Sequence, residues 1–163
     1  MIENLQKTFT KKFAGLSDLN YWERLQTLGM YSQERRLERY RVIYTWKSLE
    51  GLVPNCGLSS QHSARRGRYA AIKPLVPNSS AKLKSIKDGA FTVHGPKLFN
   101  SLPANIRNMT NCSVDSFKKQ LDDYLNCLPD EPSCDNLYPG AINLITGRQS
   151  NSIIDQARKH FRP

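Results

Sequence analysis

The sequence predicts a mainly α-helical protein, a small helical domain that carries a long basic loop. Apolar residues recur at helical spacing in several segments of the 163-residue chain. Capping residues precede these segments, and glycine or proline follows them. A short β element is a possible alternative only at residues 90–94.

Composition divides the chain into four regions. Residues 1–53 predict a three-helix N-terminal layer, and residues 54–88 a basic flexible loop. Residues 89–128 predict a short helix or strand followed by an amphipathic helix, and residues 129–163 a linker with a weak C-terminal helix. The length suffices for a real core in one domain without disulfide bonds.

The first two helices are short and closely connected. The first is amphipathic and ends near Gly15, with lysines away from a narrow apolar arc. This arc contains Ile2, Leu5, Phe9, Phe13 and Leu16. The second starts after Asn20, where Glu23 occupies the capping-box position, and stops at Gly29.

Residues 33–50 are predicted to form the central helix. Ser32 can cap it, and neither proline nor glycine interrupts it before Gly51. One apolar stripe contains Leu37, Tyr40 and Tyr44; another, nearly opposite, contains Val42, Trp46 and Leu49. A helix that is apolar on two faces expects neighbours on both. Its first half also carries four arginines, at positions 35, 36, 39 and 41.

The remaining elements are less regular. Ala90 to His94 predict a short strand or extended piece, and Pro96 then suits the first position of a short helix through Leu102. Ser113 caps an amphipathic helix that Pro129 stops. Residues 152–161 predict a weak helix that either docks or frays.

Charge is the most informative part of the composition. The net charge is +10, and residues 1–90 hold 16 basic and 7 acidic side chains, against 8 and 7 in residues 91–163. This imbalance favours a polyanionic partner such as nucleic acid or an anionic membrane face, although a soluble domain that is merely basic is an equal alternative. No apolar run reaches the length of a membrane-spanning helix.

No active site can be argued from the residues. Asp122 and Asp123 lie in a helical pattern with Lys118 and Lys119 four residues before them, which predicts a solvated charged face and not a metal pair. Histidines and cysteines do not stand at metal-ligand spacing, and phosphate-binding glycine loops and serine elbows are missing. We therefore expect no catalysis, no cofactor and no small-molecule substrate.

Sparse cysteines and the lack of a signal peptide favour an intracellular protein, nuclear or cytoplasmic. Clustered arginines are then the candidate nucleic-acid contacts. Arg65, Arg66 and Arg68 lie in the loop, within a stretch from Pro54 to Lys87 that contains no acidic residue. There they could follow a phosphate backbone without sequence specificity, and the central helix could add a rigid platform. The platform residues are Arg35, Arg36 and Arg39. The alternative for this helix is that its arginines pair with Glu34 and Glu38 and cover apolar surface.

Several blocks in order carry a family resemblance. They are FTKKFAGL, LNYWERLQTLGMYSQERRLERYRVIYTWKSLEGLVPN, the RRGR loop, FTVHGPKLFNSLPANIRN and CSVDSFKKQLDDYL. Together they resemble the region downstream of the reverse transcriptase in proteins of non-LTR (LINE-like) retrotransposons. The polymerase aspartates, the endonuclease and a zinc knuckle are missing from these blocks, so the resemblance implies a C-terminal fragment or remnant.

The resemblance implies a segment beside the polymerase thumb that helps to hold template RNA and primer. It implies RNA or an RNA/DNA hybrid and the reverse transcriptase domain as partners. Two alternatives remain, a structural module that packs on that domain and a truncated relic without function.

Overall fold

The computed structural model of the chain describes residues 2–54, 82–83, 90–131 and 152–160. Within these ranges it contains seven helices and no strand, which confirms the mainly α-helical class. Most of the predicted basic loop and most of the predicted linker lie outside the described residues.

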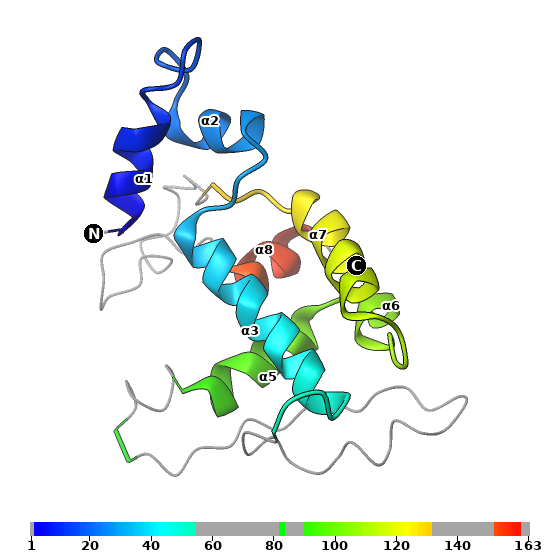
Figure 1. Cartoon of the computed structure of the whole chain (residues 1–163). Coiled ribbons are helices and arrows are strands. Elements are labelled where there is room, and N and C mark those ends of the chain that lie inside the picture. The colour runs from blue at the N-terminus through cyan, green and yellow to red at the C-terminus, as the bar shows by residue number, and fades with distance from the viewer. Residues whose placement is uncertain (1, 55–81, 84–89, 132–151, 161–163) are drawn as a thin grey trace.

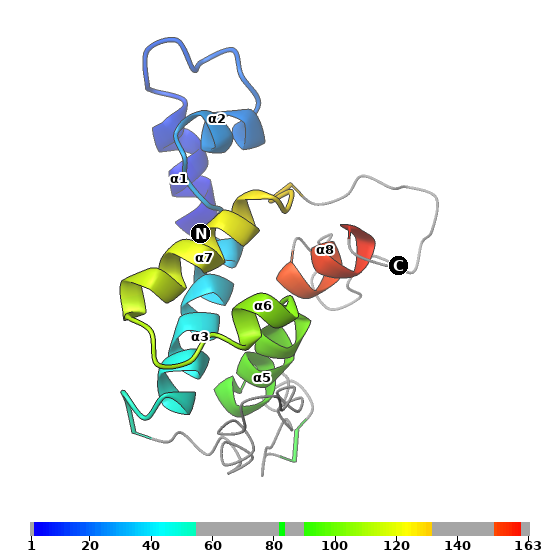
Figure 2. The same cartoon turned by 90° about the vertical axis from the view of Figure 1, so that its right-hand side faces the viewer.

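Helix α3 (Gln33–Leu49) runs through the middle of the molecule (Figure 1). It packs against α5 (Phe91–Ser101) and α7 (Val114–Asn126), and α5 in turn packs against α8 (Ile153–His160). The short α6 (Ala104–Arg107) lies between α5 and α7 in the chain. Helices α1 (Ile2–Thr10) and α2 (Tyr21–Thr27) form a pair beyond the N-terminal end of α3 (Figure 2).

Local capping signals start three of these helices, as predicted. The side chain of Asn20 accepts hydrogen bonds from the backbone N–H groups of Trp22 and Glu23, and Glu23 accepts one from the Asn20 N–H. The hydroxyls of Ser32 and Ser113 each accept one hydrogen bond, from the backbone N–H groups of Arg35 in α3 and Ser116 in α7. These caps satisfy donors that lack helical partners, which fixes where each helix begins.

The core lies between α3, α5 and α7. The rings of Trp46 and Phe117 stack with centroids 4.4 Å apart and an angle of 9° between their planes. The indole N–H of Trp46 also donates to the carbonyl oxygen of Met109 at 2.8 Å. One buried cluster therefore joins the central helix to the segments that follow residue 90. It includes Val42, Ile43, Leu49, Leu98, Phe99, Leu121, Leu125 and Ile153.

The expected short strand at residues 90–94 is wrong, because α5 already begins at Phe91. Pro96 lies inside this helix and not at its first position, and its missing N–H deprives only the Thr92 carbonyl of a helical partner. A Cβ atom on Gly95 would lie 2.7 Å from Oγ1 of Thr45. Gly95 thus lets α5 approach α3 closely, and packing against α3 decides the conformation of this segment.

Helix α1 is shorter than its predicted range, and α8 takes the docked one of its two predicted states. Helix α1 ends at Thr10, so Phe13 and Leu16 lie in the turns after it. Helix α8 docks, with Ile153, Gln156 and Ala157 buried. None of the described helices combines the length and the apolar character needed to span a membrane.

Candidate functional site

Arg35 is a buried structural residue. Its side chain has no solvent-exposed surface, its Nη2 donates to the Pro129 carbonyl oxygen at 2.8 Å, and its Nε lies 3.7 Å from Oδ1 of Asp130. Asp130 also accepts hydrogen bonds from the backbone N–H and the hydroxyl of Ser32. This arrangement ties the segment after α7 to the first turn of α3 and leaves the guanidinium no surface for a phosphate.

Arg39 is held by the opposite helix. Its Nε and Nη2 donate to the two carboxylate oxygens of Asp122 at 2.5 and 2.7 Å, a bidentate geometry. This ion pair raises the pKa of Arg39, against a smaller opposing effect of its partial burial. The sequence suggested Glu34 or Glu38 as its partner and Lys118 as the partner of Asp122; the structure instead pairs Arg39 with Asp122 across two helices.

The other predicted nucleic-acid contacts have different positions. Arg36 is half-buried, and its Nη2 donates to the Tyr31 carbonyl oxygen at 3.4 Å. Arg65, Arg66 and Arg68 lie outside the described residues. Nucleic-acid binding by these four arginines therefore stays a prediction, and two of the three helix arginines are engaged inside the fold.

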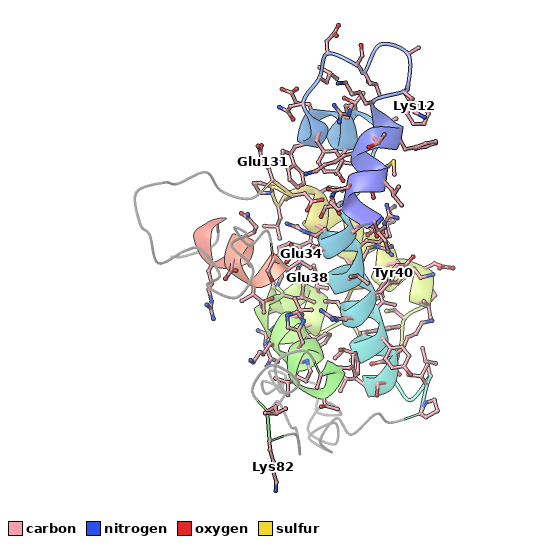
Figure 3. The ribbon with its side chains drawn as sticks, turned by 90° about the vertical axis from the view of Figure 1, so that its left-hand side faces the viewer. Lys12, Glu34, Glu38, Tyr40, Lys82 and Glu131 are labelled. Atoms are coloured by element: carbon pink, nitrogen blue, oxygen red, sulfur yellow. The ribbon has the colours of Figure 1, made fainter. Side chains whose placement is uncertain are left out.

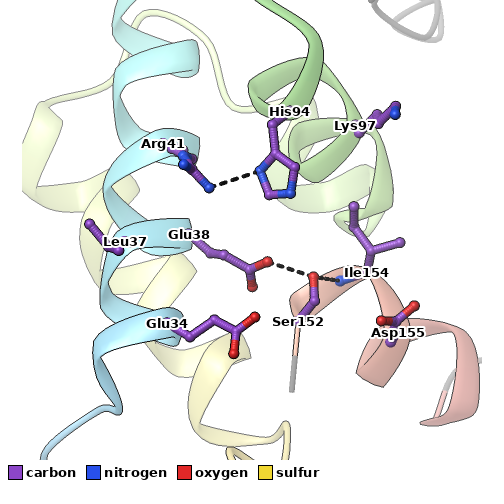
Figure 4. A pocket seen from close by; sticks show the side chains of 9 residues that line it. All are labelled: Glu34, Leu37, Glu38, Arg41, His94, Lys97, Ser152, Ile154 and Asp155. Carbon is purple, nitrogen blue, oxygen red and sulfur yellow. Dashed lines mark hydrogen bonds between the residues drawn. The ribbon is translucent and has the colours of Figure 1, made fainter. Parts of the chain in front are cut away.

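Glu38 forms a buried connection between α3 and α8 (Figure 4). Its carboxylate accepts hydrogen bonds from the Ser152 hydroxyl at 2.5 Å and from the Ile153 N–H at 2.6 Å. Burial raises the pKa of Glu38 to about 7, and these two hydrogen bonds oppose the shift. The carboxylate thus caps the N-terminus of α8 from another helix.

A polar pocket of about 350 Å³ lies beside this connection. In it, a guanidinium nitrogen of Arg41 lies 3.1 Å from Nδ1 of His94. The other lining residues are Glu34, Leu37, Lys97, Ile154 and Asp155. Among the described residues no group of three histidine, cysteine or carboxylate side chains could hold a metal ion.

Helix α1 turns its apolar side to solvent. We define the α1 apolar face as Ile2, Leu5, Phe9 and Phe13, whose exposed fractions are 64, 66, 62 and 42 %. A groove of about 480 Å³ adjoins it, lined also by Gln6, Thr8, Lys12 and Gln33. The arc predicted from the sequence also contained Leu16, which is buried, and a layer of packed helices would have buried the other four residues as well.

Polar contacts hold α1 in place instead. Gln6 donates to the Tyr31 carbonyl oxygen at 3.0 Å, and the buried Thr10 hydroxyl accepts from Nε of Arg24 at 3.2 Å. The Tyr21 hydroxyl donates to the carboxylate of Glu3. Because hydrogen bonds position α1 on α2, its apolar side remains available.

A second exposed surface, the tyrosine groove, lies on α3. Its apolar lining consists of Leu37, Tyr40, Ile43, Tyr44 and Phe91, and its charged lining of Arg41, Lys47 and Lys118. The groove has a volume of about 500 Å³. Figure 3 places Tyr40 on the opposite side of α3 from Glu38.

The sequence predicted one apolar stripe that lines the tyrosine groove, but it did not predict the groove itself. Helical spacing showed that Leu37, Tyr40 and Tyr44 share a face. Lys118 comes from α7 and Phe91 from α5, and no local pattern places either beside α3. Lys47 could have been found, because it lies one turn after Tyr44.

Comparison with models of protein families, with curated proteins and with solved structures finds no match to this chain.

Proposed function

We propose that this chain is a non-catalytic helical module of a retrotransposon reverse transcriptase protein, and that it packs on the reverse transcriptase domain through the α1 apolar face. The observation that carries the proposal is the exposure of Ile2, Leu5 and Phe9 on one side of α1. The resemblance of the sequence blocks to the region after the polymerase supports the choice of partner. We place this function inside the cell.

The energetics of the face support a docking role. Full burial of an aliphatic or aromatic side chain is worth about 1.5–3 kcal/mol, so four such residues offer substantial binding energy. Scattered apolar residues on a surface need no explanation, whereas a contiguous apolar patch commonly marks an interaction site. The ordered polar contacts on the other side of α1 present this patch on a fixed element, which lowers the entropy cost of docking.

In the isolated chain the α1 apolar face is exposed to solvent and should promote self-association. We expect the purified chain to bind a fluorescent hydrophobic dye and to self-associate in light scattering after size exclusion. The double substitution Leu5→Glu with Phe9→Glu should abolish both, because it places two charges within the face.

A matched control uses an exposed leucine elsewhere. Leu52 has an exposed fraction of 55 %, close to that of Leu5, and lies after α3. Leu52→Glu should leave dye binding and self-association unaltered. A wild-type chain that is a monodisperse monomer and does not bind the dye would contradict the docking proposal.

Low-specificity binding of RNA or an RNA/DNA hybrid is the second candidate function. The excess of basic side chains in residues 1–90 favours it, and charge of this kind binds phosphate backbones without reading sequence. Since Arg35 and Arg39 are engaged inside the fold, Arg36 with Arg65, Arg66 and Arg68 are the predicted contacts that remain.

Fluorescence anisotropy tests this candidate with single-stranded RNA, duplex DNA and a hybrid at about 50 and about 200 mM salt. With four to six phosphate contacts on a duplex, affinity should fall by roughly two to three decades across this range. Substitution of the three loop arginines by alanine should weaken binding and its salt dependence. Unaltered affinity would remove the loop from the interface.

A further inference from the structure

The tyrosine groove combines flat aromatic rings with positive charge from side chains other than the arginines predicted from the sequence. From this combination we infer that the groove binds single-stranded nucleic acid. Bases stack on Tyr40 and Tyr44, and Lys47 and Lys118 hold the neighbouring phosphates. Base stacking on aromatic side chains beside a basic groove is the general way in which proteins hold single strands.

The two tyrosines have the geometry of a stacking platform. Tyr40 and Tyr44 are four residues apart on α3 and therefore lie on the same face, one turn from each other. Their exposed fractions are 58 and 39 %, which is large for aromatic residues on a packed helix. Stacked bases would cover this apolar surface, and every base has a ring face that can do so.

Neighbouring residues hold both rings. Phe91 packs edge-on against Tyr44, with centroids 5.2 Å apart and planes at 81°. The guanidinium carbon of Arg39 lies 5.8 Å from the Tyr40 ring centroid, and Arg39 is itself fixed by Asp122. Rings that are already ordered lose little conformational freedom when a ligand binds.

Charge complementarity selects a polyanion as the occupant. The lining of the groove contains three basic residues and no acidic one. Lys118 contacts Asp115 at 3.1 Å, but this pair lies within one helix turn and Asp115 is exposed, so the pair is weak and a phosphate can replace the carboxylate. An apolar protein segment would leave these cations without complementary charge.

The form of the nucleic acid follows from the rings. A duplex keeps its bases stacked on one another and offers only its backbone to Lys47 and Lys118. A single strand offers base faces as well as phosphates, so it uses both parts of the lining. This inference rests on the nucleic-acid binding given above as the second function, and it assigns that binding to a place and a ligand form.

The test uses the purified full chain and two labelled oligomers of equal length, an oligouridylate and an abasic phosphodiester strand. At about 50 mM salt, the base-bearing strand should bind at least tenfold more tightly than the abasic one, because stacking contributes about 1–3 kcal/mol per base. Tyr40→Ala with Tyr44→Ala should remove this difference and leave abasic binding unaltered. Tyr40→Phe with Tyr44→Phe keeps the ring faces and should retain it.

The cations have a separate readout. Lys47→Gln with Lys118→Gln should weaken both oligomers and lower the slope of log affinity against log salt by about 1.4, since each contact to a single strand contributes about 0.7. Leu52→Ala, at an exposed residue outside both proposed surfaces, is the control and should change neither oligomer. Circular dichroism verifies that each variant keeps its helices.

The outcomes separate this inference from the function on which it rests. Equal binding of both oligomers, unaltered in the alanine variant, would overturn base stacking in the groove and leave phosphate binding in place. No binding of either oligomer at low salt would overturn both. Binding of an acidic amphipathic peptide in place of the oligouridylate would assign the groove to a protein partner and overturn the inference.

Discussion

Arg39 and Asp122 join the two longest described helices, α3 and α7, through two hydrogen bonds of 2.5 and 2.7 Å. Both side chains are mostly shielded, with exposed fractions of 17 and 32 %. A carboxylate and a guanidinium in this geometry form a strong pair whose two parallel contacts also fix orientation. An arginine predicted to hold phosphate thus has a structural partner.

The pair should contribute measurably to stability. Because two charge-assisted hydrogen bonds at a partly shielded site are lost, Arg39→Ala should lower the free energy of unfolding by about 1–2 kcal/mol. Arg39→Lys should recover only part of this, because an ammonium group cannot form the bidentate contact. A double-mutant cycle with Asp122→Ala in urea unfolding isolates the coupling. Weakened RNA binding at unaltered stability would instead favour a phosphate contact.

Stability should depend on pH through Glu38. Its pKa is raised in the fold from 4.5 to about 7, so the folded state holds a proton that the unfolded state has released. The associated stability is fully present below about pH 4.5 and is lost as the pH rises through 7, by about 3 kcal/mol.

Urea unfolding at several pH values between 4.5 and 7.5 measures this loss. Glu38→Gln carries no titrating proton and should flatten the profile in that window, while Asp155→Asn, at the same pocket, should not. A wild-type profile that rises toward pH 7 would show that Glu38 is ionised in the fold.

Gly95→Ala should destabilise the protein although alanine favours helices over glycine by about 1 kcal/mol. The new Cβ would lie 2.7 Å from Oγ1 of Thr45 and 3.1 Å from a ring carbon of Phe91, so α3 and α5 must separate. We expect a net loss of about 1–3 kcal/mol in thermal or urea unfolding. In a Thr45→Ala background the closest contact is gone, and the loss should shrink.

Breaking the contact between Asp130 and Arg35 should cost more than replacing the arginine by an apolar residue. Asp130→Ala removes the carboxylate that faces a fully buried guanidinium and also accepts from Ser32. A loss of about 3–5 kcal/mol is expected, whereas Arg35→Met leaves no buried charge behind and should cost less. Chemical unfolding of both variants decides the order, and a larger loss for Arg35→Met would contradict it.

The sequence predicted what local rules control. Asn20, Ser32 and Ser113 act on backbone groups within three residues, so their caps and the helices that follow could be inferred without tertiary information. The apolar spacing of α3 likewise predicted Val42, Trp46 and Leu49 in the core. It also predicted neighbours for the opposite stripe of Leu37, Tyr40 and Tyr44, and this expectation is wrong, because these side chains are exposed. The short strand expected at residues 90–94 is wrong, because this segment packs as a helix against α3, which no local rule predicts.

The candidate sites depend on partners far apart in the chain. Arg39 and Asp122 are separated by 83 residues, and Glu38 and Ser152 by 114. No spacing rule connects such positions, so helical spacing predicted acidic partners for the arginines on their own helix. The exposure of the α1 apolar face was equally hidden, because hydrogen bonds from Gln6 and Arg24 decide which side of α1 packs.

The way α1 is attached implies uneven cooperativity within the molecule. An element held by a few hydrogen bonds, with its apolar side in solvent, buries little surface and opens with little free energy. In native-state hydrogen exchange, amides of α1 should exchange through local opening. Amides around Trp46 and Phe117 should exchange only through global unfolding. A partner that covers Leu5 and Phe9 would therefore reveal itself first as slowed exchange in α1, before any change in the melting temperature.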